Sequence, residues 1–402
     1  MVVDENSVTC SGQQNIKSSA SCEFDSDTQL LTMSNAFSRD LSSGTTVTFT
    51  FDSIRNPIST KSMIGFVVTT GDTDSGFIDS STARLSVSTP AAITTMTVSA
   101  DSYTVQEYTQ YTINFDIPVP LLTGCLIDII FPPQIILDSS LTSSQGSSFF
   151  GAERDLVGFM DTAGNLFEVT DGCPTYMRNN LPAQVTLSLI PNPFYEMTTT
   201  DVFSIYIYDE SRNPICEIGF GPTFTTTPNS IIVNSVASDN TEVNALASLQ
   251  FSLQPLSDCL AGGRLVMEVP SEFTMPSECS LTPLSLVSSS SSCSISGQTL
   301  TFEDFFSSDY SYSSSLAVQF EIAGFQMPPS VAPTSDFSFT FYTSWPDDSF
   351  QLVDTATSTN ALQATQGYFP YADAVPSSYT ANDVGTYRVE FVIANPLLLE
   401  SQ

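Results

Sequence analysis

The sequence predicts an all-β fold of tandem antiparallel β-sandwich domains, and three observations predict it. Apolar and polar residues alternate with period two, so that Ile113, Phe115 and Ile117 point one way and Asn114 and Asp116 the other. No segment carries a sustained helical stripe. The alternating segments also recur at a period of about 135 residues, and self-similarity at a fixed period indicates a tandem array.

Two landmarks define the repeat. An amphipathic segment precedes a Pro-Leu pair three times, and aligning Phe115, Phe251 and Phe391 gives spacings of about 136 and about 140 residues. The proline of a polar turn between strands recurs at Pro57, Pro193 and Pro328, with spacings of about 136 and about 135 residues. Cysteines follow the same period: Cys125 and Cys259 are about one period apart, and Cys10 to Cys279 and Cys22 to Cys293 span about two periods.

Each period contains about seven alternating runs, separated by stretches rich in Ser, Asp, Asn, Pro and Gly. Such runs occupy residues 47–51, 185–189, 203–207 and 337–341. Abundant β-branched and aromatic residues in runs of this number favour a sandwich of two sheets.

The repeat predicts four segments along the chain. Residues 1–92 form an incomplete sandwich that lacks its first strands, residues 93–229 and 230–366 form complete sandwiches, and residues 367–402 supply the first strands of a further one. Placing residues 1–10 after 391–402 gives a sequence that aligns with 251–279 and with 115–137. We therefore expect the last segment to complete the first.

This split predicts an assembly interface made of apolar tail residues: Tyr387, Val389, Phe391, Ile393 and Leu397. Burying the first four of these side chains contributes roughly 6 to 12 kcal/mol gross. Two arrangements satisfy them: the tail completes the head of the next subunit by strand addition, giving an open filament, or the chain is a window of a longer tandem polypeptide. A tail folding back onto its own head is disfavoured because two sandwiches lie between them.

Eight cysteines without any histidine or C-x-x-C pair indicate disulfides and an oxidising, extracellular compartment. Equivalence across repeats pairs Cys10 with Cys22 and Cys279 with Cys293. For Cys125, Cys173, Cys216 and Cys259 the sequence does not choose, although Cys125 with Cys173 or with Cys216 are the favoured options within one domain. Some of the cysteines being buried thiols is the alternative.

The charge balance excludes several partners. The chain has 43 acidic and 10 basic residues, a formal net charge of −33. Nucleic acid and anionic membrane surfaces require clustered Lys and Arg, which are absent. No apolar run approaches the roughly 18 residues of a membrane span, so we expect no membrane insertion within this chain.

Acidic residues raise the question of metals. Asp25 with Asp27, Asp72 with Asp74, and Asp347 with Asp348 are candidate calcium ligands in loops, because Ca²⁺ takes several oxygen ligands. None matches the twelve-residue calcium loop, and the alternative is a solvated surface that keeps the protein soluble. No other cofactor is expected.

Catalysis is not expected either. The absence of histidine removes the commonest general base and most zinc sites. A carboxylate pair remains available in principle, but no acidic pair stands in an apolar sequence context that would raise a pKa.

Serine and threonine are the other excess. We expect O-linked sugar at Ser330, Thr334 and Ser335, where prolines keep the backbone extended. The alternative is that hydroxyl residues only fill the outward faces of strands and turns.

Tandem sandwiches, an Asn-Pro turn at Asn56-Pro57 and Asn192-Pro193, and sparse cysteines together resemble the immunoglobulin-like or cadherin-like repeats of extracellular fibres and adhesins. The chain departs from antibody-type domains in having one tryptophan, Trp345, and does not match cadherin-type calcium ligands. The split domain is similar in logic to pilus subunits completed by a neighbour's strand.

These inferences converge on an extracellular structural protein that assembles head to tail into a filament with its own copies as partners, carrying covalent glycans. The alternative is a non-polymerising cell-surface adhesin stalk, in which the sandwiches are spacers.

Overall fold

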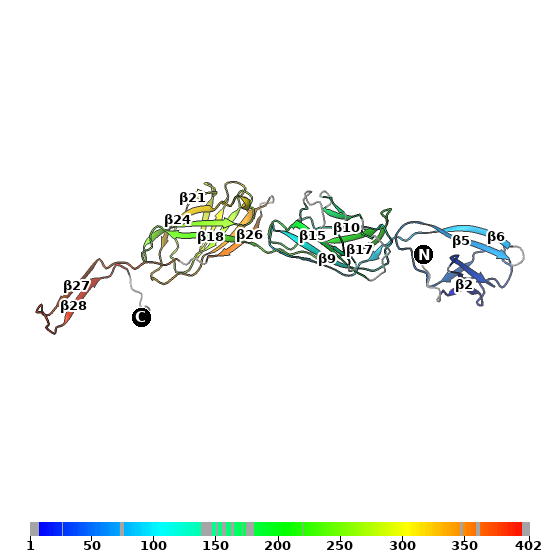
Figure 1. Cartoon of the computed structure of the whole chain (residues 1–402), viewed down its shortest axis with the longest axis horizontal. Coiled ribbons are helices and arrows are strands. Elements are labelled where there is room, and N and C mark those ends of the chain that lie inside the picture. The colour runs from blue at the N-terminus through cyan, green and yellow to red at the C-terminus, as the bar shows by residue number, and fades with distance from the viewer. Residues whose placement is uncertain are drawn as a thin grey trace.

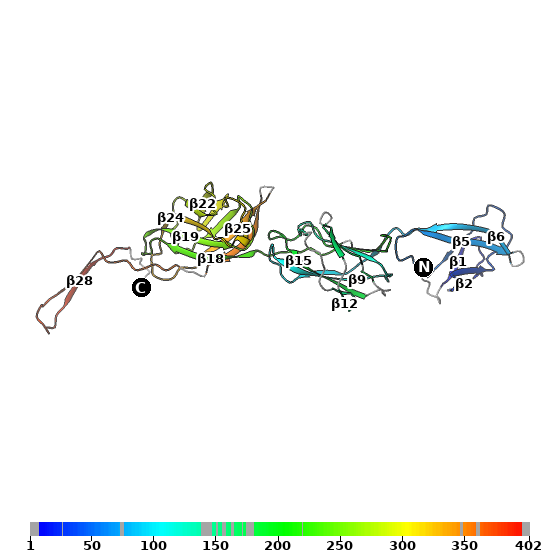
Figure 2. The ribbon, with the colours of Figure 1, turned by 45° about the horizontal axis from the view of Figure 1, so that its top comes forward.

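The computed structural model describes residues 8–25, 27–72, 76–137, 147–149, 152–154, 158–161, 165–170, 172–173, 181–218, 220–345, 349–358 and 362–395. Within these ranges the fold is all-β, which confirms the predicted class; the one exception is a single 3₁₀ turn, η1 (Tyr312–Ser314). The chain forms a row: the strands β1 to β6 lie at one end, two sandwiches in the middle and a hairpin at the other end (Figures 1 and 2).

The second sandwich shows the repeat in its most regular form. Its strands are β18 (Asn229–Ser238), β19 (Leu246–Pro255), β20 (Arg264–Glu268), β21 (Ser280–Ser285), β22 (Ser292–Ser296), β23 (Thr299–Glu303), β24 (Val318–Gln326), β25 (Ser338–Ser344) and β26 (Phe350–Thr357). One face has the order β21-β24-β19-β18 and the other the order β18-β26-β25-β20-β23-β22. Strand β18 belongs to both, because its first residues pair in parallel with β26 and the rest pair antiparallel with β19.

The first sandwich repeats this order. Its strands are β7 (Ala91–Ala92), β8 (Met96–Ala100), β9 (Tyr108–Ile117), β10 (Leu126–Ile130), β11 (Ser147–Phe149), β12 (Ala152–Arg154), β13 (Gly158–Asp161), β14 (Leu166–Val169), β15 (Leu181–Pro191), β16 (Ser204–Tyr208) and β17 (Pro214–Glu217). The sheets are β12-β11-β15-β9-β8 and β13-β14-β10-β16-β17-β7. The parallel β7–β17 pair corresponds to β18–β26, so this unit begins just ahead of residue 93.

The two ends of the chain contain only two-stranded sheets. The head, residues 8–92, has β1 (Cys10–Gln14), β2 (Ser21–Asp25), β3 (Leu30–Ser34), β4 (Thr48–Phe51), β5 (Met63–Asp72) and β6 (Gly76–Leu85). They pair as β1-β4, β2-β3 and β5-β6. The tail, residues 367–395, is the antiparallel hairpin of β27 (Tyr371–Pro376) and β28 (Tyr387–Val392).

Left-handed backbone positions show which parts of the repeat the ends represent. Positive φ recurs at Ser53 (69°), Leu189 (61°) and Gly324 (90°), spaced like the predicted proline landmarks. It recurs again, at two equal intervals, at Gln106 (60°), Asn244 (57°) and Asn382 (67°). Residues with side chains rarely adopt this conformation, so its recurrence marks equivalent points. The head thus has the later strands of a repeat and the tail its first two.

Strand register corrects the predicted alignment of Phe251 with Phe115 and with Phe391. Phe251 lies opposite Val236 as Ile113 lies opposite Val98, so Leu253, not Phe251, occupies the place of Phe115 and Phe391. A slip of two residues keeps every side chain on the same face, which is why the alternation did not reveal it.

The cysteine spacing was also misleading in one case. Cys125 follows the left-handed Gly124. The interval that separates Gln106 from Asn244 also separates Gly124 from the left-handed Gly262, so these two glycines are equivalent. Cys259 lies before its glycine and Cys125 lies after, so the two cysteines are not equivalent.

Candidate assembly site

Buried apolar side chains are confined to the two sandwiches. Among the described residues, every buried hydrophobic lies between Ile93 and Ala364, in two clusters that correspond to the two units. The described residues of the head and the tail form strands and turns but no buried core of their own. Each therefore presents apolar surface that the complete units bury.

The tail hairpin exposes the residues that the sequence predicted as an interface. Tyr387 is 71% exposed and Phe391 is 50% exposed, with Val389 and Ile393 similarly open. The Phe391 ring contacts Phe369 at a centroid distance of 4.8 Å, which covers only part of it. Leu397 lies outside the described residues.

The same positions are buried wherever the repeat is complete. Tyr387, Val389 and Phe391 correspond to Tyr111, Ile113 and Phe115, which are at most 3% exposed. In the second sandwich the counterparts are Leu249, Phe251 and Leu253, all at most 1% exposed. The tail thus has the inward face of a second strand without the sheets that would cover it.

The described part of the head lacks strands that the two complete units have. In a complete unit β19 separates β18 from β24, and β20 separates β23 from β25. Among the described head residues no strand takes the place of β18, β19 or β20, so β1-β4, β2-β3 and β5-β6 stay separate. Their inward residues are open: Phe49 and Phe51 are only half-buried, and Ile78 is 64% exposed where its counterparts Ile215 and Val353 are buried.

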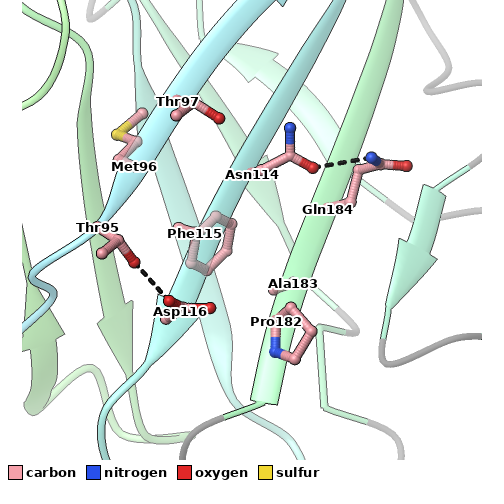
Figure 3. Close-up of a pocket in the computed structure, with 9 residues that line it drawn as sticks. All are labelled: Thr95, Met96, Thr97, Asn114, Phe115, Asp116, Pro182, Ala183 and Gln184. Carbon is pink, nitrogen blue, oxygen red and sulfur yellow. Dashed lines mark hydrogen bonds between the residues drawn. The ribbon is translucent and has the colours of Figure 1, made fainter.

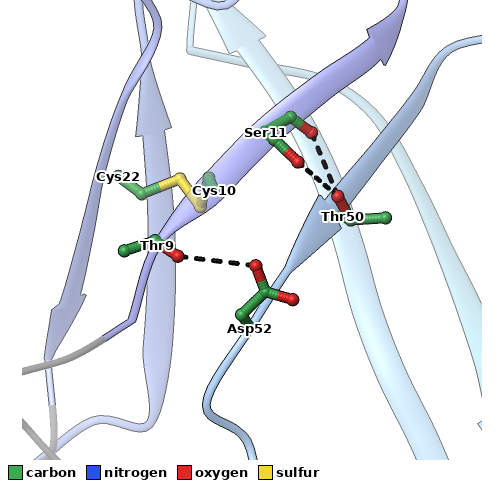
Figure 4. The surroundings of a disulfide bond; sticks show 6 residues. All are labelled: Thr9, Cys10, Ser11, Cys22, Thr50 and Asp52. Atoms are coloured by element: carbon green, nitrogen blue, oxygen red, sulfur yellow. Dashed lines mark hydrogen bonds between the residues drawn. A yellow bond between two sulfur atoms is a disulfide. The ribbon is translucent and has the colours of Figure 1, made fainter.

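One disulfide links two of these separate sheets, β1-β4 and β2-β3. Cys10 on β1 is bonded to Cys22 on β2, with a Cα–Cα distance of 6.0 Å (Figure 4). Beside the bond, Thr9 donates to Asp52, and the Ser11 and Thr50 hydroxyls lie within hydrogen-bond distance across β1 and β4. Cys279 is bonded to Cys293 at the equivalent place, so both pairs are those that repeat equivalence favours.

The structure also chooses among the pairings that the sequence left open. Cys125 is bonded to Cys173, while Cys216 and Cys259 are buried free thiols. Burial raises the pKa of Cys216 to about 12 and raises that of Cys259 as well, so both stay protonated and unreactive.

Calcium candidates do not converge. Asp25 accepts hydrogen bonds from Thr28 Oγ1 at 2.6 Å and from the Asp27 backbone N–H at 2.9 Å, and the Thr28 bond is the main reason that its pKa is lowered. Asp25 therefore closes the β2–β3 turn. Asp72 lies at the end of β5, and Asp74, Asp347 and Asp348 lie outside the described residues. No group of three or more potential ligands for a metal occurs in the described part of the chain.

One acidic pair contradicts the expectation that no acidic pair lies in apolar surroundings that would raise a pKa. Asp128 and Glu168 lie opposite each other on β10 and β14, both buried, and Arg212 forms ion pairs with both. Burial is the largest influence on Asp128 and raises its pKa, while Arg212 opposes the shift. Local sequence context could not reveal this pair, because its members lie on strands that are distant in the chain. Because both carboxylates share the Arg212 guanidinium, the three side chains form a structural ion-pair cluster.

A hollow of about 450 Å³ lies on the first sandwich, against β8, β9 and β15 (Figure 3). Its titratable group is Asp116, which accepts a hydrogen bond from Thr95 Oγ1, and Asn114 accepts one from Gln184. These polar groups of the lining are thus paired with one another.

The predicted sugar acceptors differ in access. Ser330 and Ser335 are exposed. Thr334 is only 6% exposed and its hydroxyl accepts the Leu362 backbone N–H, so we keep only the two serines as candidates.

Sequence reasoning missed the joints between units. At the middle joint, between the two sandwiches, Gln106 Nε2 donates to the Asp258 carbonyl at 2.9 Å and Gln106 Oε1 accepts the Asp258 N–H at 2.7 Å. Trp345 packs on Tyr195 with a centroid distance of 5.0 Å. The isolated Trp345, with no counterpart in another repeat, was the available signal.

One backbone hydrogen bond occurs at both joints. The Glu196 N–H donates to the Leu352 carbonyl at 2.8 Å at the middle joint. The Thr60 N–H donates to the Pro214 carbonyl at 2.9 Å at the head joint, between the head and the first sandwich. Thr60 and Glu196 each stand three places after a landmark proline, Pro57 and Pro193.

The part of the chain that the structure describes contains no helix of membrane-spanning length and hydropathy. No protein-family model matches the chain, and no curated protein matches it in sequence. Among solved structures, the C-terminal domain of the Streptococcus pyogenes antigen I/II-family protein AspA matches 65% of this chain and 98% of its own, with 8% identity and a TM-score of 0.25. A partial N-terminal region of the enterococcal surface protein matches 68% and 94%, with 9% identity and a TM-score of 0.22. Likenesses at this level carry no argument about function.

Proposed function

We propose that the chain is an extracellular structural protein that assembles head to tail into a filament, the tail hairpin of one copy completing the head of the next. One observation carries the proposal: the four isolated two-stranded sheets correspond to parts of a single sandwich. The tail β27-β28 corresponds to β18-β19, and the head pairs β1-β4, β2-β3 and β5-β6 correspond to β21-β24, β22-β23 and β25-β26. Together they supply every strand of a unit except the equivalent of β20.

Both complete units give the same register for docking. Ile113 lies opposite Val185, and Phe251 lies opposite Phe320. Transferred by the repeat spacing, both pairs place Val389 of one copy opposite Phe49 of the next. The neighbouring inward pairs are Tyr387 with Phe51 and Phe391 with Val47. Agreement between two units that differ in sequence supports a single register.

Docking would bury Tyr387, Val389, Phe391 and Ile393 together with the open face of the head. Four large apolar side chains contribute roughly 6 to 12 kcal/mol gross, and each ladder hydrogen bond adds a net 0.5 to 1.5 kcal/mol or so. The contact is heterologous, because different surfaces meet, so repetition generates an open filament.

Three disulfides among the described residues support an oxidising, extracellular location. O-linked sugar at the exposed Ser330 and Ser335 is part of the same proposal, since both lie in a proline-rich loop.

The second candidate function is an adhesin stalk of tandem spacers. The middle joint favours it, because Gln106, Trp345 and the Glu196 N–H connect neighbouring sandwiches in a fixed row. A stalk differs from a filament in that it stays monomeric.

Replacing Phe391 with Asp separates the two functions. The substitution places a charge where Phe115 and Leu253 are buried, and burying an unpaired charge is costly. We expect Phe391→Asp to remain a monomer in sedimentation velocity while wild type and Phe391→Leu polymerise, with Trp345 fluorescence showing that the sandwiches stay folded. Polymers of unchanged length from Phe391→Asp would rule out docking, and a monomeric wild type would favour the stalk.

A further inference from the structure

The joints between units of this chain share a backbone hydrogen bond whose donor position recurs at the far end of the second sandwich. At the head joint and at the middle joint, a backbone N–H three places after a landmark proline donates to a carbonyl of the adjacent unit. The third landmark proline, Pro328, lies in the second sandwich, and the described residues that follow this sandwich form only the tail hairpin. Among the described residues, the corresponding donor has no complete unit next to it.

The donor position is fixed from both sides. The carbonyls of Pro193 and Pro328 accept equivalent N–H groups, from Gln106 and Asn244. Further along, the hydroxyls of Thr199 and Thr334 accept equivalent N–H groups, from Phe224 and Leu362. The two prolines and the two threonines are separated by the same interval, which places Val331 as the counterpart of Glu196. Val331 is exposed, and its N–H has no backbone acceptor within the described ranges.

The acceptor position is fixed by a strand bulge. In β6, β17 and β26 one residue is skipped in the pairing with the preceding strand: Ile78, Ile215 and Val353. The accepting carbonyls belong to Pro214 and Leu352, directly before the bulge. Phe77 holds this place in the head and is 85% exposed.

A related feature lies at the same end of the second sandwich. Asn244 is the counterpart of Gln106, whose side chain clamps Asp258 across the middle joint. The amide nitrogen Nδ2 of Asn244 is buried and has no hydrogen-bond partner in the described part of the protein. A buried orphan donor is costly, and it stands where the other unit reaches across to its neighbour.

We propose that a second copy of this chain contacts this end through a subunit joint, in which the Val331 N–H of one copy donates to the Phe77 carbonyl of the next. The inference rests on the proposed function, because tail docking brings that head into place. It adds a contact surface outside the exchanged hairpin and makes the step between copies repeat the step between sandwiches. The filament would then continue the row without a flexible link at each subunit boundary.

Two blocked full-length chains test the joint without polymerisation. A donor with Phe49→Asp keeps its tail but cannot accept another, and an acceptor with Phe391→Asp keeps its head but cannot donate. In the donor, Val331→Pro removes the N–H, and Val331→Ala is the matched control that keeps it. We expect Val331→Pro to weaken the one-to-one association by about fivefold to tenfold in sedimentation, and Val331→Ala to change it less than about threefold.

Hydrogen exchange provides a test that does not depend on the folding of the proline variant. On mixing donor and acceptor, the Val331 amide of the otherwise unaltered donor should gain protection of about tenfold or more. Equal affinity of the Pro and Ala variants with no gain in protection would overturn the joint and leave tail docking standing. No association between donor and acceptor would overturn docking and the joint together.

Discussion

Asp354 is a buried carboxylate on β26 of the second sandwich, between β18 and β25, and it holds the chain after β19. Its Oδ2 accepts the backbone N–H groups of Leu256 at 2.9 Å and Ser257 at 3.0 Å, while its Oδ1 is buried without a partner among the described residues. Burial is the largest influence and raises its pKa to about 6. The neighbouring Cys259 and Tyr310 stay neutral in this range, because burial raises their pKa values too.

The direction of this shift fixes the sign of a pH effect. The folded-state pKa lies above the ordinary value of 3.8, so folding favours the protonated carboxyl. The stabilising contribution is fully present below about pH 4 and is lost as the pH rises through about 6. The difference between these limits corresponds to about 3 kcal/mol.

We predict that Asp354→Asn removes this dependence. Asparagine keeps the acceptor and carries no charge, so the variant should be more stable than wild type at pH 7 and similar to it at pH 4. Urea unfolding followed by Trp345 fluorescence measures the free energy at each pH, with the exposed Asp336→Asn as control. A wild-type-minus-variant difference that stays constant between pH 4 and pH 7 would contradict the assignment.

At the scale of elements, alternation predicted strands well and their pairing less well. Ile113, Phe115 and Ile117 were expected on one face and are buried together. The predicted equivalence of Phe251 with Phe115 was wrong by two residues. Alternation could not detect the error, because a two-residue slip leaves the apolar face unchanged. Register had to come from cross-strand pairs and from left-handed positions such as Gln106 and Asn382, which period-two alternation does not encode.

The sequence likewise predicted one part of the candidate assembly site, the tail residues, and missed another, the joint residues. Tyr387 and Phe391 could be predicted because a repeat unit without its remaining strands leaves aromatic residues uncovered. The joint residues Gln106 and Glu196 could not be predicted, since their contacts with Asp258 and Leu352 link segments that are distant in the sequence. Such contacts depend on how whole sandwiches meet.

The docking register predicts a specific cross-link on the outward face. Thr112 lies opposite Thr186, and Gln250 lies opposite Glu321. By the repeat spacing, Arg388 of one copy should lie opposite Thr50 of the next. Opposed residues have Cβ atoms about 4.5 to 5.5 Å apart, within reach of a disulfide with small adjustments.

Mild oxidation of Arg388→Cys mixed with Thr50→Cys should therefore give a covalent dimer on a non-reducing gel. The matched control is Thr48→Cys, one step along the same face, where the diagonal separation of about 7 to 8 Å is too long. Stronger cross-linking to position 48 than to position 50 would show that the tail docks in another register.

At the scale of the molecule, the disulfides lie within units and the proposed contacts lie between copies. Cys10 with Cys22 and Cys279 with Cys293 close loops of 12 and 14 residues. Loops of this length gain about 3 kcal/mol from the bond in the chain-entropy description. The two bonds differ in context. Strands β21 and β22 belong to one nine-stranded sheet, whereas among the described residues β1 pairs only with β4 and β2 only with β3. The first bond thus links head sheets that share no strand.

Reduction should therefore affect free heads much more than filaments. In unassembled Phe391→Asp chains, reductant should expose residues 14–21 to limited proteolysis, because β1-β4 and β2-β3 then separate. In filaments the same loop should stay protected, since a docked β28 would pair with β4 and its apolar face would pack against the other head strands, and sedimentation should show unchanged polymer length. Depolymerisation by reductant alone would mean that disulfides between copies, not strand pairing, hold the filament.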